Sequence, residues 1–136
     1  MPTLMAVNHK TILIVEDHPA TRQAVVALFD GALLNGVLPS CRLMAVDSAE
    51  GALSLCADEV PAVVIMDISL PGMNGIEATQ RIRAQFPQVQ VVMHSSNDMQ
   101  VYRDESAAVG ACAFVSKGRN SSELIAVVSR LLPGVA

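Results

Sequence analysis

Five side chains capable of ionic or nucleophilic chemistry stand at or just beyond the ends of short apolar runs. Two acids follow the first run, an acid ends the third, a hydroxyl follows the fourth and an amine follows the fifth: Glu16, Asp17, Asp67, Ser95 and Lys117. In open parallel α/β sheets, ligands bind beyond the carboxyl ends of the strands, where the strand order reverses. If the runs are strands of such a sheet, one edge collects three carboxylates, a hydroxyl and an ammonium group.

The three carboxylates repel one another at that edge. Such a cluster persists either because some members have a raised pKa or because it binds a hard cation. We favour the cation, because Mg²⁺ is held by one or two carboxylates completed by waters and by carbonyl or phosphate oxygens. Asp17 and Asp67 supply carboxylates, the loop after Asp67 supplies a backbone carbonyl that we assign to Ser69, and Glu16 holds a metal-bound water. The sequence has no Cys or His cluster with the spacing of a zinc site.

Asp67 is the candidate nucleophile of this edge. One of its oxygens can attack a phosphoryl group while the metal ion and Lys117 offset the charge that spreads over the equatorial oxygens. Lys117 is a compact point charge able to contact both carboxylate and phosphate, and Ser95 can donate a hydrogen bond to a phosphoryl oxygen. The product is an aspartyl phosphate.

The elements that position these side chains follow from hydrophobic patterning. Short apolar runs rich in β-branched residues alternate with longer amphipathic segments, which is typical of a parallel sheet covered by helices on both faces. The pattern predicts an α/β fold of class (βα)5, a doubly wound five-stranded parallel sheet. The expected strands cover residues 11–15, 41–46, 62–66, 89–93 and 111–115.

Five helices are expected between and after these strands. Four helix starts are indicated by a capping side chain three residues before a Glu or Gln, namely Asp47–Glu50, Asn74–Glu77, Asn97–Gln100 and Asn120–Glu123. Pro133-Gly134 is expected to end the fifth helix. The fourth helix, at about residues 98–109, has the weakest apolar face, and we expect it to be the most mobile.

Composition limits the classes of protein that this chain can be. The 136 residues make one domain, and 51% hydrophobic against 16% charged residues predict a large core. The net charge is −4, and no run of basic residues could neutralise phosphates, so direct contact with nucleic acid is not expected. The sequence shows neither a signal peptide nor a membrane span, so we expect a cytoplasmic protein.

The chemical residues lie in segments that resemble the receiver domain of two-component response regulators, the CheY-like domain. The acidic pair lies in ILIVED at 12–17, the acceptor in VVIMDISLPGMNG at 63–75, and the lysine in FVSK at 114–117. The distance of 50 residues from Asp67 to Lys117, and of 22 from Ser95 to Lys117, is also similar to the family. The resemblance covers residues 10–132, leaving an N-terminal extension at 1–9 and a C-terminal tail at 133–136.

The resemblance implies a flavodoxin-like strand order 2-1-3-4-5 and phosphotransfer to Asp67 from a sensor histidine kinase, with Mg²⁺ required. A slow self-catalysed hydrolysis then resets the domain, so the protein is a switch and not an enzyme acting on an external substrate. Family positions that tune hydrolysis correspond to Ser69 and Asn97. On phosphorylation, the hydroxyl of Ser95 is implied to move toward the phosphoryl group, and Phe114 to turn inward behind it.

The chain departs from the usual family pattern at four positions. Glu16 replaces the more usual Asp, Ser95 the commoner Thr and Phe114 the commoner Tyr, while Gly118 stands where Pro is frequent. Because Phe has no hydroxyl, a switch at this position must rest on packing. The pair His18-Pro19 resembles the subgroup with a C-terminal helix-turn-helix output domain, which is absent or removed here, so the implied output is control of transcription.

Other interpretations remain open. The chain is alternatively a receiver-like adaptor that works without phosphorylation, although its acidic pair, acceptor and lysine are intact, or a stand-alone single-domain receiver. A metal-dependent phosphatase needs a substrate pocket, and a flavodoxin-like cofactor binder needs a phosphate-cradling loop where the acidic residues Glu16 and Asp17 stand. A homodimer is expected through the first and fifth helices or through the fourth helix and fifth strand.

Overall fold

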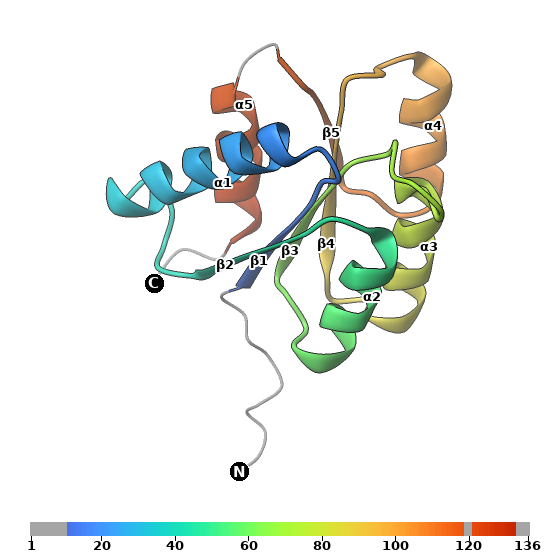
Figure 1. Cartoon of the computed structure of the whole chain (residues 1–136), viewed down its shortest axis with the longest axis horizontal. Coiled ribbons are helices and arrows are strands. Elements are labelled where there is room, and N and C mark those ends of the chain that lie inside the picture. The colour runs from blue at the N-terminus through green and yellow to red at the C-terminus, as the bar shows by residue number, and fades with distance from the viewer. Residues whose placement is uncertain (1–10, 119–120, 133–136) are drawn as a thin grey trace.

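The computed structural model describes residues 11–118 and 121–132. Strands and helices alternate along this part of the chain (Figure 1). The strands are β1 (Thr11–Val15), β2 (Arg42–Val46), β3 (Val63–Met66), β4 (Gln90–Ser95) and β5 (Ala113–Ser116). The helices are α1 (Pro19–Leu34), α2 (Ala49–Asp58), α3 (Gly75–Gln85), α4 (Gln100–Ala108) and α5 (Ser121–Leu131). The predicted alternation of five strands and five helices is confirmed.

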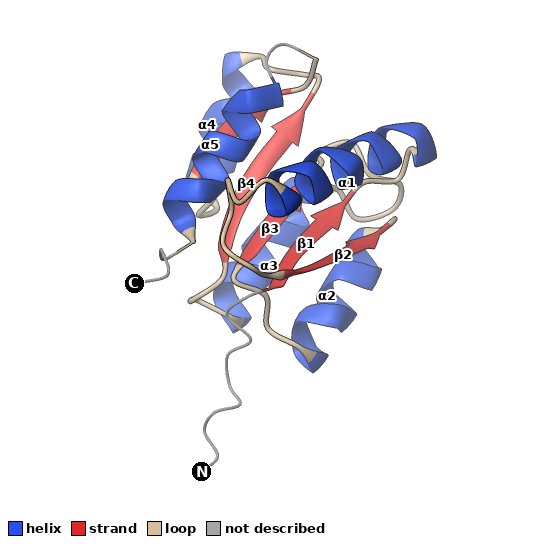
Figure 2. Cartoon of the chain, turned by 90° about the vertical axis from the view of Figure 1, so that its left-hand side faces the viewer, coloured by secondary structure: helices blue, strands red, loops and turns tan. Residues whose placement is uncertain are grey.

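The strands form one parallel sheet in the order β2-β1-β3-β4-β5. Helices α1 and α5 cover one face, and α2, α3 and α4 cover the other (Figures 1 and 2). This is the doubly wound, flavodoxin-like order that the resemblance implies. The strand order reverses at β1 and β3, so the carboxyl ends of these two strands flank the crevice where such sheets bind ligands.

The core consists of two apolar layers separated by the sheet. Along β1, Ile12 and Ile14 face the layer under α1 and α5, whereas Leu13 and Val15 face the layer under α2 and α3. All residues of β1 and β3 are buried, which explains why their sequences are continuous apolar runs. The central strands are therefore rigid supports for the residues at their carboxyl ends.

Several predicted boundaries and caps are corrected by the structure. Strand β4 runs through Ser95, so this residue ends the strand and does not follow it. Helix α2 is capped by Ser48, whose hydroxyl accepts from Gly51 N at 3.0 Å, and not by Asp47. The cap at Asn74 is confirmed by a 2.9 Å bond from Glu77 N. The pair Asn120–Glu123 and Pro133-Gly134 lie wholly or partly outside the described residues.

Helix α4 also begins differently from the prediction. Its N-cap is Met99, which makes no side-chain cap hydrogen bond in the described chain, and the Asn97 side chain instead accepts from Met99 N at 3.4 Å. Ser106 is the single buried residue of α4. That α4 is the most mobile helix stays a prediction. Within the described residues, no helix is long and apolar enough to cross a membrane.

Candidate functional site

The acidic residues lie close together because β1 and β3 are neighbouring strands. Backbone hydrogen bonds to neighbouring strands continue one residue past the end of each. Asp67 N donates to Val15 O at 3.1 Å, and Glu16 N donates to Val46 O at 3.1 Å. These bonds hold both residues in extended backbone at the carboxyl edge. Glu16, Asp17 and Asp67 each offer a carboxylate oxygen, and these oxygens lie within 4.8 Å of one another. The convergence predicted from strand ends is therefore confirmed for the three acids.

Lys117 reaches the same cluster from the end of β5, the edge strand of the sheet. Its backbone N–H donates to Ser95 O at 2.9 Å, which places the residue directly after β5. Its Nζ lies 2.7 Å from Glu16 Oε1 and 3.3 Å from Asp67 Oδ1. The ammonium group thus bridges two buried carboxylates and lies closer to Glu16 than to Asp67.

The Asp67 carboxyl is in an environment that disfavours its charge. Burial raises its pKa from 3.8 to about 6, Lys117 opposes the rise, and Glu16 adds to it. Asp67 Oδ1 also accepts a long hydrogen bond of 3.4 Å from Ser69 N. One ammonium group does not neutralise three clustered carboxylates, so the site retains a deficit of positive charge.

A divalent cation fits this donor set. Mg²⁺ prefers carboxylate and carbonyl oxygens, and the described cluster offers three carboxylates, of which Asp17 is the most open to solvent. Binding an ion there offsets the repulsion that otherwise acts between Glu16 and Asp67. The second oxygen of Glu16 accepts from His18 N at 3.2 Å, which fixes the side chain at the rim of the cluster.

The loop from Asp67 to α3 is held close to the acceptor by a glycine. Gly75 N donates to Ile68 O at 2.9 Å, and a Cβ at Gly75 would lie 2.0 Å from Asp67 O. Only glycine permits this approach of helix α3 to the end of β3. The motif at 72–75 is therefore explained by packing around Asp67, with Gly72 at a φ of 73° turning the chain.

Ser95 and Asn97 lie together at the end of β4. Ser95 is 1% exposed, and its Oγ accepts from Asn97 N at 3.1 Å. Ser95 ends β4 and Lys117 follows β5, and these neighbouring strands pair in register at Ser95 and Ser116. The hydroxyl is thus positioned by the loop that follows it, and a hydroxyl that accepts this bond can still donate its own hydrogen.

Phe114 lies on β5, partly buried against the layer under α2 and α3. The guanidinium carbon of Arg103, on α4, lies 4.6 Å from the centroid of the Phe114 ring. A cation at this distance over an aromatic face is attracted by the ring quadrupole. The predicted packing role of Phe114 therefore involves a charged partner that sequence reasoning did not identify.

Arg22 is a second residue that sequence reasoning missed. Its Nη1 donates to the carbonyl oxygens of Glu16 at 3.0 Å and Asp17 at 3.3 Å. Helical side chains lean toward the helix N-terminus, so an arginine in the first turn of α1 returns to the preceding loop. That directional rule, applied to the residue five positions after Asp17, is the signal that could have found it.

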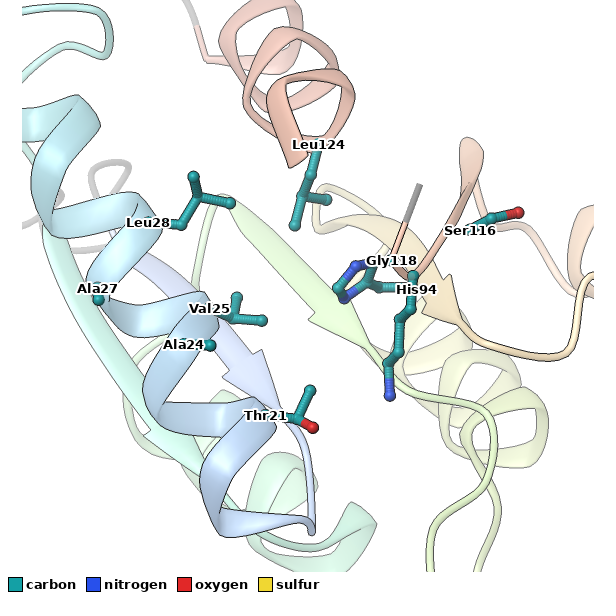
Figure 3. Close-up of a pocket in the computed structure, with 10 residues that line it drawn as sticks. Thr21, Ala24, Val25, Ala27, Leu28, His94, Ser116, Gly118 and Leu124 are labelled. Atoms are coloured by element: carbon teal, nitrogen blue, oxygen red, sulfur yellow. The ribbon is translucent and has the colours of Figure 1, made fainter. Parts of the chain in front are cut away.

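His94 precedes Ser95 in β4 and lies near enough to Glu16 and Lys117 to interact with both charges. It lines a pocket between α1 and the segment after β5, with Val25, Leu28 and Leu124 among its other lining residues (Figure 3). Burial, followed by the nearby charge of Lys117, lowers the pKa of His94 to about 4. The imidazole is therefore neutral at physiological pH.

A doubly wound parallel sheet with an acid cluster and a lysine at its carboxyl edge defines the class of protein. The response regulator receiver domain family matches residues 12–129. Transcriptional activator protein ExaE of Pseudomonas putida is 38% identical over 125 residues, 92% of this chain and 56% of that protein. A DNA-binding response regulator of the LuxR family from Staphylococcus aureus superposes with a TM-score of 0.80 at 26% identity, over 91% of this chain and 99% of that one.

The chain belongs to the response regulator receiver domain family. Receiver domains are phosphorylation switches of two-component systems, phosphorylated by sensor histidine kinases, and they bind Mg²⁺ at acidic residues. Response regulator GacA of Pseudomonas aeruginosa, 25% identical over 123 residues, is a further relative. That match covers 90% of this chain but 55% of GacA. The chain therefore spans about half the length of such relatives.

Proposed function

We propose that Asp67 is the residue of this chain that accepts the phosphoryl group. The observation that carries the proposal is the contact of Lys117 Nζ with Asp67 Oδ1 at 3.3 Å, inside a cluster of three carboxylates at the strand-order reversal. Asp67 lies between the other two carboxylates, which can bind a cation, and the ammonium group of Lys117. Two positive charges beside one carboxylate oxygen favour its in-line attack on phosphorus. Asp67 is also 5% exposed, which limits competing water.

The transfer balances as a simple displacement. An Asp67 carboxylate oxygen forms a bond to phosphorus while the bond from phosphorus to the kinase histidine nitrogen breaks, and the departing imidazole takes up a proton. Asp17, Asp67 and the Ser69 carbonyl would hold Mg²⁺, and Glu16 would hold a water bound to it; the ion would supply charge neutralisation for the phosphoryl oxygens. Lys117 neutralises a further oxygen, and Ser95 donates its hydroxyl hydrogen to another.

Reset of the switch is a hydrolysis at the same phosphorus atom. Water attacks, the bond from phosphorus to the Asp67 oxygen breaks, and inorganic phosphate leaves. Ser69 lies two residues after Asp67 in the sequence, and Asn97 lies two residues after Ser95. We assign both residues to tuning the hydrolysis rate. The chain thus carries out its own covalent chemistry without turning over an external substrate.

The test is the intact mass of the protein after incubation with acetyl phosphate and Mg²⁺. We expect the wild-type chain to gain one phosphoryl group and to lose it again after the donor is removed. Asp67→Asn and a sample containing a chelator should gain nothing, whereas Asp30→Asn, which removes an exposed carboxylate of α1, should behave as wild type. Failure of the wild type to gain mass would favour a receiver-like adaptor that works without phosphorylation.

The relatives support a proposal for the output of the switch. Because the relatives include transcriptional regulators and this chain spans about half their length, we propose that residues 10–132 act as a cytoplasmic receiver controlling transcription through an output domain outside this chain. A stand-alone receiver is the alternative. Full-length expression from the native gene, followed by mass determination of the product, separates the two.

Dimerisation is proposed through one of two faces. Leu34 and Val37, near the end of α1, are 87% and 56% exposed, while Met99 and Val101, at the start of α4, are 61% and 49% exposed. Apolar exposure at α1 supports pairing through α1 and α5, and that at α4 supports pairing through α4 and β5. Sedimentation of the phosphorylated chain should show which of Leu34→Asp and Val101→Asp abolishes the dimer.

A further inference from the structure

A cluster of polar contacts ties helix α4 to strand β5 and to the loop that precedes the helix. Arg103 Nε donates to Asp98 O at 3.2 Å, and Arg103 Nη2 donates to Ser116 Oγ at 3.2 Å. Ser116 Oγ donates in turn to Asp98 Oδ2 at 3.2 Å. With the Arg103 guanidinium also 4.6 Å from the Phe114 ring, these four residues form a closed unit that we call the α4 clasp.

The α4 clasp continues to the proposed phosphorylation site through the backbone between β4 and α4. Asp98 follows Asn97 in the chain. The Asn97 N–H donates to Ser95 Oγ at 3.1 Å, and the Asn97 side chain accepts from Met99 N. Ser116, on the other side, immediately precedes Lys117. Any displacement of the Ser95 hydroxyl toward a group on Asp67 therefore pulls on the segment that Arg103 and Ser116 hold.

In the first half of α4, Tyr102 packs against the core layer under α2 and α3. Ser106, in its second half, is its single buried residue, and its N-cap lacks a side-chain hydrogen bond in the described chain. Val101 is half-exposed. The Arg103 contacts act together with the packing of Tyr102 to fix this segment. A guanidinium suits this role because its planar fork can stack on a ring while donating in its own plane.

We propose that Arg103 is a positioning residue that restrains the segment from Ser95 to Phe114 in the unphosphorylated protein and so slows phosphorylation of Asp67. The inference rests on the proposed function. Phe114 has no hydroxyl with which to anchor its own ring, so the charged partner on α4 sets where the ring lies. Breaking the α4 clasp frees the Ser95 loop to follow the phosphoryl group and raises the population of the reactive arrangement.

The experiment compares initial phosphorylation rates by intact mass with acetyl phosphate and Mg²⁺. Arg103→Ala retains high helix propensity and should phosphorylate at least about threefold faster than wild type. Arg103→Lys keeps the charge but loses the fork, and it should fall between the two. Arg81→Ala, which removes an exposed arginine of α3 paired with Glu77, is the matched control and should leave the rate unchanged.

A double-mutant cycle separates positioning from general loosening of the fold. In a Phe114→Leu background the ring face is gone, so adding Arg103→Ala should change the rate far less than it does in wild type. Amide exchange of residues 97–103 should be faster in Arg103→Ala without donor.

The outcomes that overturn the inference are distinct from failure of the proposed function. If the wild type gains a phosphoryl group but Arg103→Ala reacts at the same rate or more slowly, Arg103 does not restrain the site. An unchanged effect of Arg103→Ala in the Phe114→Leu background would likewise refute the coupling to the ring. If the wild type itself gains no mass, the proposed function fails, and this inference fails with it.

Discussion

Replacing Asp67 by Asn should stabilise the protein in the absence of Mg²⁺. Burial, opposed by Lys117 and assisted by Glu16, raises the pKa of Asp67 from 3.8 to about 6. Ionising this carboxyl at neutral pH therefore costs more in the folded than in the unfolded protein. A difference of about 2 pH units, at about 1.4 kcal/mol each, corresponds to about 3 kcal/mol. Water at the rim of the site screens the charges, so we expect a gain of about 1 to 3 kcal/mol.

The pH dependence gives this prediction its sign. Because the folded protein holds the Asp67 proton more tightly, the carboxyl lowers stability progressively as the pH rises from about 4 to 6, and the loss is constant above that. The advantage of Asp67→Asn should therefore be about half as large at pH 5 as at pH 8. His94, with its pKa lowered to about 4, acts in the opposite direction but is present in both proteins.

The measurement is urea denaturation of wild type and Asp67→Asn at pH 5 and pH 8, with a chelator present. Asp30→Asn controls for the loss of one negative charge at an exposed position. An Asp67→Asn protein that is less stable than wild type at pH 8, or a difference that does not grow with pH, would refute the electrostatic account of the site.

Three further predictions test the packing, the metal and the buried histidine. Gly75→Ala should lower the free energy of unfolding in urea by more than about 3 kcal/mol, because its Cβ would overlap Asp67 O. Gly31→Ala, with nothing within 4 Å of the new Cβ, should raise it by about 0.5 to 1 kcal/mol. Equal effects would contradict the close approach at Gly75. Millimolar Mg²⁺ should raise the Tm of the wild type, and Asp17→Asn should lose most of that rise; an undiminished rise would place the ion elsewhere. The pKa of His94 is lowered to about 4, so the stability that its neutral form contributes is lost as the pH falls below 6.5. In urea denaturation, wild type should therefore lose about 1 to 2 kcal/mol more of its unfolding free energy than His94→Gln between pH 7 and pH 5. Equal losses would show that the imidazole is not desolvated.

Much of the fold could be predicted because its signals are local. The continuous apolar runs at β1 and β3 mark strands buried on both faces, and the alternation with helical periodicity predicts the parallel sheet. Errors occurred where two neighbouring residues could serve the same purpose. Asp47 and Ser48 both suit a helix cap, and the path of the chain into α2, which periodicity does not describe, decides for Ser48.

The sequence by itself determined which residues reach the carboxyl edge of the sheet, because strand direction and strand ends are properties of the hydrophobic pattern. Only the tertiary structure decided how those residues pair. Lys117 lies nearer to Glu16 than to Asp67, and Arg103 stacks on Phe114, because side chains distant in sequence compete for partners once the backbone is placed. Such choices depend on distances of a few ångströms between separate elements, and no local periodicity encodes them.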